Sequence, residues 1–490
     1  MFSFDGHGVR SVPASGRSRA RRPIRDVLGR FACVPTRSPS SISTILFQPP
    51  IFPVVNRTDR AIAGFTGLGH STLHGFELVI PVFVPVWLVA FETTPTTLGI
   101  VLGAGYALIG LGSPLAGVLA DAYGSKRLVL ASIGGMGVAF AALSLVESLV
   151  GLALVLLVWG AAASLYHPAG LSLISRGAER RGTVLAFHGV GGNVGMVAYP
   201  LAAILLLVFF EWRVVALLLA VPAAFCVVAG LVLPVDGRRV RSPAPVADRP
   251  DDSTTAPSKD PETAPSNDPA ATNPRAPDKS GIAASLSRFL ASSRGLFVGG
   301  FVIVFAIQLV YGVYYRGIFT FLPDVLSGLP IFEPVAIGEH EIQAGQFAYS
   351  GLLLAGVFGQ YAGGVLSDRI RPERALLGTF ATLLVLSILF VPASAAGVTP
   401  LLVVCALLGF CIYVFAPIGQ TLVAEYVPEG RHGLSFGYVY LGTFGVGATG
   451  AAIAGAALEF GGIEALFTVL SVLVVGCLAL AIGLVVRYGR

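Results

Sequence analysis

Three ionisable side chains share one face of the first long apolar stretch of the chain. His70, His74 and Glu77 are four and three residues apart, and such spacings place side chains on one face of an α-helix. Counted from Gly64 at about 1.5 Å per residue, Glu77 falls near the middle of a membrane, where an ionisable group is costly unless it faces protein or a water-filled cavity. We therefore predict that these three residues serve proton coupling or substrate binding. A purely structural His–Glu pair is the alternative.

Other apolar stretches carry isolated polar side chains. They are His167, His188, Asn193, Gln308, Tyr311, Arg316, Gln360, Tyr413 and Gln420. We predict that these residues also serve proton coupling or substrate binding, because a cation beside aromatic hydroxyls suits an anionic or polar substrate. The alternatives are packing histidines, an Asn193 amide that only joins two helices, and an Arg316 side chain that extends to the membrane surface.

Hydrophobic residues make up 54% of the 490 residues and charged residues 12%, whereas soluble domains carry about 25% charged residues. The chain is therefore predicted to be a multi-pass protein with the lipid bilayer as its surroundings. Basic loops explain its net charge of +5, so no nucleic acid is expected as a partner. The five cysteines form no CxxC pair and no HExxH pattern occurs, so we expect no catalytic residue, no metal site and no cofactor. A polytopic membrane enzyme or a receptor stays open as an alternative class.

Apolar stretches long enough to cross a bilayer, about twenty residues, follow one another from Gly64 onward. We predict twelve helical spans, near residues 64–91, 96–119, 127–147, 149–174, 182–208, 213–234, 295–322, 343–367, 374–393, 398–424, 432–458 and 462–486. The predicted fold is an all-α membrane protein with two six-helix bundles, at residues 61–235 and 281–490. Residues 1–60 are predicted to be a disordered basic tail or an extension from a misplaced start. The proline-rich residues 236–280 are predicted to be a disordered cytoplasmic linker.

The loops between these spans differ in charge on the two sides of the membrane. On the side of both termini, the short loops contain Lys126, Arg127, Arg176, Arg180, Arg181, Arg369, Arg371, Arg374 and Arg431. In the opposite loops, Arg213 is the single arginine or lysine residue. Because Lys and Arg concentrate in cytoplasmic loops, we predict that both termini lie in the cytoplasm. We also predict that the protein is a monomer in the cell membrane.

One charged turn occurs twice in the chain. Residues Gly117–Arg127 and Gly364–Arg374 each contain a glycine, three further residues, an aspartate and then basic residues, and the two copies lie 247 residues apart. Asp121 and Asp368 can accept hydrogen bonds from helix N-termini or from nearby arginines, Arg127 and Arg374. We predict a conformational latch with the following members: Gly117, Asp121, Arg127, Gly364, Asp368 and Arg369. Charges that only set the topology are the alternative.

These turns resemble the cytoplasmic loop motif of the major facilitator superfamily. Tyr166-His167-Pro168, together with Gly191–Gly195 and Pro200, is similar to the fosmidomycin-resistance branch. The resemblance implies a secondary transporter that moves a small solute by alternating access, with protons as the coupling partner and drug or metabolite efflux as the activity. Ala122 stands where the family usually has a basic residue, and the glycine–proline signature of drug/proton antiporters is incomplete. Facilitative or proton-symport uptake of a small organic anion is the alternative.

Overall fold

The structure, a computed structural model, describes residues 56–233, 295–332, 335–337, 340–427 and 432–488. The predicted linker at 236–280 lies outside these residues, and so does the predicted tail of residues 1–60 as far as residue 55. Residues 57–60 are helical, so the prediction of disorder is wrong for the end of the tail. Helix α1 (Arg57–Ala90) begins where it does because Asn56 caps it, its side chain accepting a hydrogen bond from the Asp59 N–H at 2.6 Å.

Six further helices complete the first half in the described residues. They are α2 (Pro95–Tyr123), α3 (Ser125–Leu143), α4 (Leu149–Ser164), α5 (Tyr166–Gly177), α6 (Arg181–Leu207) and α7 (Trp212–Val232). Helices α4 and α5 together form one apolar segment of membrane length, Leu149–Gly177. The helix is interrupted at Leu165 because Pro168 has no N–H to donate to the carbonyl of Ser164.

The second half repeats this order of helices. Its described elements are α9 (Gly300–Ser327), α10 (Ala344–Arg369), α11 (Pro372–Ala396), α12 (Val398–Tyr426), α13 (His432–Tyr440), the π-helix η2 (Leu441–Val446) and α14 (Thr449–Tyr488). A short antiparallel hairpin of β1 (Val335–Ile337) and β2 (His340–Ile342) lies between α9 and α10. The sequence pattern did not predict this hairpin, whose strands are only three residues long.

Eleven helical segments of the described residues are long and apolar enough to cross a membrane. The last of them, Ser435–Tyr488, has 54 residues, and Gly462 interrupts it with a φ of 64°. A left-handed backbone conformation ends an α-helix and favours glycine, so this segment contains two crossings. The predicted fold of twelve spans in two halves is confirmed.

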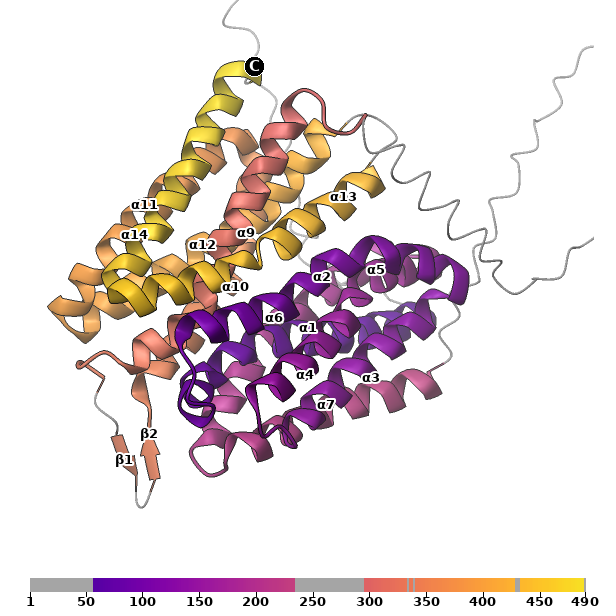
Figure 1. Cartoon of the computed structure of the whole chain (residues 1–490). Coiled ribbons are helices and arrows are strands. Elements are labelled where there is room, and N and C mark those ends of the chain that lie inside the picture. The colour runs from indigo at the N-terminus through magenta and orange to yellow at the C-terminus, as the bar shows by residue number, and fades with distance from the viewer. Residues whose placement is uncertain (1–55, 234–294, 333–334, 338–339, 428–431, 489–490) are drawn as a thin grey trace, which may run out of the picture. The chain divides into compact units, whose positions relative to one another are not determined.

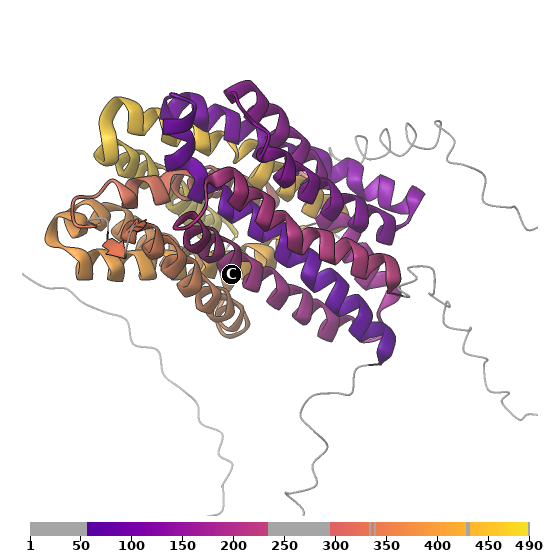
Figure 2. The same cartoon turned by 90° about the horizontal axis from the view of Figure 1, so that it is seen from below.

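Helices pack within each half and across the boundary between the halves (Figures 1 and 2). In the first half α1 packs on α6, α2 on α4, and α3 on α7; in the second half α10 packs on α12 and α9 on α14. Across the boundary, α2 packs on α14 and η2, α1 on α9, and α6 on α10. Small residues permit the closest approach: Gly110 of α2 lies against Gly445 of η2, and Gly99 lies against Ala451 of α14.

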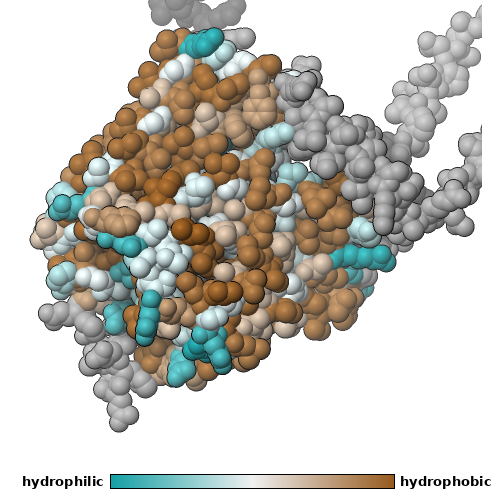
Figure 3. Space-filling view, in the orientation of Figure 1, coloured by the Kyte–Doolittle hydropathy of each residue, from teal (hydrophilic) through white to brown (hydrophobic). Residues whose placement is uncertain are grey.

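Hydrophobic residues cover most of the face shown in Figure 3. Exposed large apolar side chains occur on helices of both halves, for example Val150 and Val158 of α4 and Val472 and Val486 of α14. Such a surface is unfavourable in water and matches the hydrocarbon of a bilayer.

Candidate functional site

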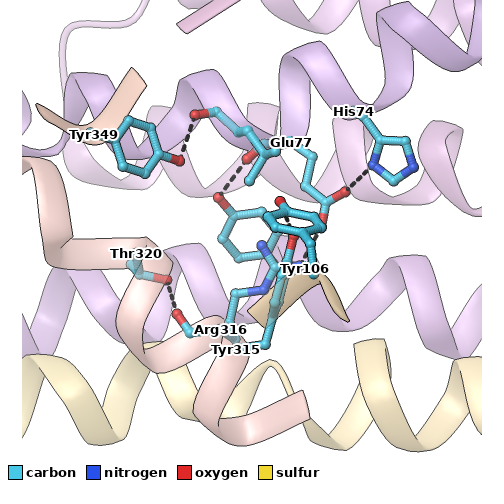
Figure 4. Close-up of polar contacts among 9 residues, drawn as sticks. His74, Glu77, Tyr106, Tyr315, Arg316, Thr320 and Tyr349 are labelled. Atoms are coloured by element: carbon cyan, nitrogen blue, oxygen red, sulfur yellow. Dashed lines mark hydrogen bonds and ion pairs between the residues drawn. The ribbon is translucent and has the colours of Figure 1, made fainter. Parts of the chain in front are cut away.

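A buried ion pair joins the two halves of the molecule. Glu77 of α1 and Arg316 of α9 are each only 2% exposed, and Arg316 Nη2 donates to Glu77 Oε1 at 2.6 Å. The other carboxylate oxygen, Oε2, accepts a hydrogen bond from His74 Nδ1 at 3.0 Å (Figure 4). Glu77 therefore contacts one partner from its own helix and one from the opposite half.

Tyrosines from three helices surround this pair. The Arg316 guanidinium carbon lies 3.6 Å from the centre of the Tyr106 ring and 5.6 Å from that of Tyr315, within the range of cation–π attraction. The Tyr106 hydroxyl donates to the Glu77 carbonyl at 3.2 Å, and the Tyr349 hydroxyl donates to the Leu78 carbonyl at 3.0 Å. The aromatic rings thus partly replace water around a guanidinium that is removed from solvent.

Pro81 explains why a tyrosine hydroxyl is needed at this place. A proline inside a helix has no N–H for the carbonyl four residues before it, and for Pro81 that carbonyl belongs to Glu77. Tyr106 supplies the missing donor from α2. No sequence pattern singled out Tyr106 and Tyr349, although the unpaired carbonyl before Pro81 was a signal that a neighbouring helix must provide a donor.

Arg316 retains unused hydrogen-bonding capacity. Its Nη1 is buried and has no hydrogen-bond partner among the described residues. The alternative that Arg316 extends to the membrane surface is wrong, because the side chain is buried against α1 and α2. The alternative of a His–Glu pair confined to the first half is incomplete for the same reason, since Glu77 also binds Arg316 of the second half.

The four histidines of the predicted site come together from three helices. His70 and His74 lie on α1, His167 on α5 and His188 on α6. The His70 ring stacks on that of His188 with centroids 4.0 Å apart, and it lies 4.6 Å from the His74 ring and 5.3 Å from the His167 ring. His70 Nδ1 donates to the His188 carbonyl at 2.8 Å, and His188 Nδ1 donates to the Thr66 carbonyl at 3.2 Å.

The remaining predicted site residues differ from one another in burial and in hydrogen bonding. Tyr311 is buried and its hydroxyl donates to the Ile412 carbonyl at 2.6 Å, while the hydroxyls of Tyr413 and Tyr315 lie 3.2 Å apart. Gln308 is buried, and its side-chain nitrogen lies against Gly419 of α12. The other three are less buried: Asn193 and Gln360 are half-buried, and Gln420 is exposed.

The residues of the predicted latch are arranged differently in the two turns. Asp121 Oδ1 accepts from Arg176 Nη2 of α5 and not from Arg127, which is exposed. Asp368 and Arg369 are exposed, and neither forms a hydrogen bond or ion pair with any described residue. The space around Gly117 and Gly364 is open, so close packing does not require glycine at either position in this structure.

Other candidate sites are weaker. Two mostly apolar surface pockets, one between α11 and α12 and one between α10 and α12, contain none of the predicted residues. Residues 433–437, GLSFG, match the letters of a hydrolase nucleophile turn. That motif requires a sharp strand-to-helix turn with an exposed serine, whereas Ser435 is buried within a helix.

Comparison with solved structures places this arrangement among transporters of one fold. A variant of the nucleoside transporter NupG is similar with a TM-score of 0.64 and 15% identity, over 88% of this chain and 100% of that chain. A bacterial homologue of the human lysosomal transporter Spinster, inward-facing and occupied, gives 0.61 and 13%, over 88% and 98% of the two chains. The peptide transporter POT in complex with sulfate gives 0.64 and 14%, over 87% and 94%. A search of curated proteins finds no match.

The model of the Major Facilitator Superfamily matches residues 63–396 and 328–489. These matches cover nearly all of the described helices, and the solved structures compared above are transporters. The fold, the apolar surface and the family match agree: the chain is a multi-pass membrane transporter of small molecules, and it belongs to the major facilitator superfamily.

Proposed function

We propose that this chain is a proton-coupled secondary transporter of a small organic anion, and that the Glu77–Arg316 pair lies at the centre of its transport site. The observation that carries the proposal is the position of this pair. It is buried, and it bridges α1 of the first half and α9 of the second half.

Alternating access requires the two halves to move relative to each other around the site. When α1 and α9 separate, both members of the pair lose their partner. An unpaired buried charge is unfavourable by several kcal/mol, so each group needs a replacement. A substrate carboxylate or phosphonate is a suitable partner for Arg316, because planar or multidentate anions match a guanidinium.

Charge balance connects the anion to a proton. Once an anion occupies Arg316, the Glu77 carboxylate would be left with His74 alone. A proton on the carboxylate removes this charge without any further partner. Anion binding and proton binding thus favour each other, which is the requirement for coupled transport.

Arg316 Nη1 supports the anion as the substrate class. This donor is buried and unpaired among the described residues, whereas buried donors normally have a partner. A small anion would satisfy it. The solved relative POT has been crystallised with sulfate, so a member of this fold binds an inorganic anion.

The proposal also covers the topology of the chain, its location and the direction of transport. The excess of Lys and Arg in the short loops on the side of the termini supports a topology with both termini in the cytoplasm. A monomer in the cell membrane is part of the same proposal. In that orientation, the contacts of Gly99 with Ala451 and of Pro95 with Gly455 close the outer side. The Thr96 N–H also donates to Glu459 Oε2 at 3.1 Å on this side. Because the anion and the proton bind together, an inwardly directed proton gradient would drive uptake of the anion, whereas the resemblance of Tyr166-His167-Pro168 to the fosmidomycin-resistance branch implies efflux.

The test is transport by the purified chain in proteoliposomes, with radiolabelled carboxylates, phosphonates and neutral solutes. We expect anion accumulation driven by a pH gradient with the acidic side outside, as symport requires, whereas accumulation driven by the opposite gradient would indicate antiport. The Glu77→Gln variant keeps a hydrogen-bond acceptor for Arg316, so it should retain anion exchange and lose pH-driven accumulation. Glu92→Gln, beyond the end of the same helix, is the control. Wild-type accumulation by Glu77→Gln would refute proton coupling at Glu77, and transport of neutral solutes alone would refute the anion.

A further inference from the structure

We propose that His70, His74 and His167 form a binding site for a divalent transition-metal ion of the Zn²⁺, Ni²⁺ or Co²⁺ kind. This inference goes beyond the proposed transport of an anion. Each of the three histidines offers one ring nitrogen, and these nitrogens all lie within 4.8 Å of one another. No spacing along the chain predicts this metal site, because the ligands come from two helices about a hundred residues apart.

Hydrogen bonds fix which nitrogen of His70 is available. Its Nδ1 contacts the His188 carbonyl at 2.8 Å, and a carbonyl oxygen can only accept, so Nδ1 carries the hydrogen. In the neutral ring the lone pair is then on Nε2. This Nε2 is buried and has no partner among the described residues. A buried acceptor without a donor is uncommon, and a metal ion would satisfy it.

His74 is oriented in a similar way by a carboxylate. Its Nδ1 lies 3.0 Å from Glu77 Oε2 and donates to it, which leaves the lone pair on Nε2. Metal-binding histidines usually donate their other ring N–H to a carboxylate or a carbonyl, and this contact orients the ring and strengthens it as a ligand. His74 has the carboxylate contact and His70 has the carbonyl contact.

His167 supplies a third ring without a competing bond. It forms no hydrogen bond with a described residue, and its ring lies 5.3 Å from that of His70 and 5.6 Å from that of His74. Among the described residues, its ring also contacts those of Tyr166 and of Tyr440 in the second half. Its side chain can therefore turn toward the other two histidines without breaking a bond.

The ligand chemistry selects the class of ion. Three imidazoles suit zinc, nickel, cobalt and copper, whereas magnesium and calcium prefer oxygen ligands. Zn–N bonds of about 2.0–2.1 Å in a tetrahedral site bring ligand nitrogens to about 3.4 Å from one another. From separations of up to 4.8 Å, the ligand nitrogens must therefore approach one another by up to about 1.4 Å. Three protein ligands leave a fourth position open for water or for an anion.

The test is metal binding by the full chain in detergent, without any transport measurement. Protein dialysed against Zn²⁺ should retain one ion per chain by elemental analysis, and Co²⁺ should give the visible absorption of a tetrahedral site. His167→Gln should weaken Zn²⁺ binding by at least about a hundredfold, because loss of an outer contact alone costs 10–100-fold. Glu77→Gln, which replaces the carboxylate behind His74 by an amide and leaves the three ligands in place, should weaken it by about 10–100-fold.

The matched control is Glu92→Gln, which lies beyond the end of α1 and outside the three-ligand set. It should bind Zn²⁺ as the wild type does. Thermal unfolding of each apo-protein identifies a variant that has lost its fold, and His167→Gln breaks no hydrogen bond among the described residues. Wild-type protein that retains no Zn²⁺, or equal retention by wild type and His167→Gln, would overturn the proposal. Since binding is measured without substrate, this result is independent of the proposed anion transport.

Discussion

The two halves of the molecule share one packing scheme but carry different chemistry. The first half contributes a carboxylate and four histidines to the centre, whereas the second half contributes an arginine and several tyrosines. Where the first half has Tyr166-His167-Pro168, the second half has Phe415-Ala416-Pro417, 249 residues later. The proline is kept and the polar side chains are not. The two halves therefore share a proline that lies at a helix interruption in the first half and inside the continuous α12 in the second, and they differ in the polar side chains beside it.

The shared packing is visible at the closest helix contacts. A Cβ atom added at Gly160 of α4 would overlap the carbonyl oxygen of Gly105 of α2. Gly409, 249 residues after Gly160, has the same relation to the carbonyl of Leu352, which lies 247 residues after Gly105. The same pair of helices thus touches at the same level in both halves.

The largest effect is expected from removing the cation that only the second half supplies. Arg316→Met should leave the Glu77 carboxylate buried with His74 alone, and loss of one partner of a buried pair costs about 3–5 kcal/mol. We expect a large fall in the thermal unfolding temperature in detergent and loss of transport. The double variant Glu77→Gln/Arg316→Met should regain part of this stability, because no unpaired charge remains. Equal stability of Arg316→Met and wild type would show that the two halves do not depend on each other at this contact.

The next largest effect tests the packing that the halves share. Gly160→Ala and Gly409→Ala should each destabilise the protein by about 1–3 kcal/mol, since both place a methyl group against a backbone carbonyl. Gly117→Ala and Gly364→Ala are matched controls, because nothing lies near an added Cβ at either position. These controls should unfold at the wild-type temperature. A large effect at Gly160 with none at Gly409 would break the equivalence of the two halves.

A smaller effect is expected from the hydroxyl that compensates for Pro81 in the first half. Tyr106→Phe keeps the aromatic ring over Arg316 but leaves the Glu77 backbone carbonyl without its donor. We expect the free energy of unfolding to fall by about 1–3 kcal/mol. Tyr199→Phe is the control, because the Tyr199 hydroxyl lies 3.5 Å from Thr72 Oγ1 and forms at most a weak bond. Unfolding temperatures of the two variants give the comparison, and a drop in Tyr199→Phe equal to that in Tyr106→Phe would contradict it.

The smallest effect concerns the repeated charged turn. Asp121 binds Arg176, and the position 249 residues after Arg176 is Glu425, which cannot pair with Asp368. Arg176→Gln should lower the free energy of unfolding by no more than about 1 kcal/mol, because the Asp121–Arg176 pair is exposed. Glu425→Arg should give Asp368 a partner and slow transport if breaking such a pair is part of the cycle. Initial transport rates test this, and an unchanged rate in both variants would mean that the charges serve topology only.

The sequence alone determined the membrane class, the number of crossings and the duplication. Long apolar stretches identify spans because a bilayer leaves the backbone no alternative to helices, and the offset of the two charged turns identifies the repeat. The sequence also singled out Glu77 and His74, because their spacing puts them on one helical face. It did not predict the partner of Asp121, which is Arg176 rather than Arg127.

Only the tertiary structure decided which of these polar groups meet. The contact of Glu77 with Arg316 joins residues 239 positions apart, and the three clustered histidines come from two helices. A helical pattern fixes the face of a residue on its own helix, but not the rotation and depth of the helix that packs against it. Those are set by close contacts such as Gly195 with Ser71 and Gly110 with Gly445, where the absence of a side chain determines how near two backbones can come.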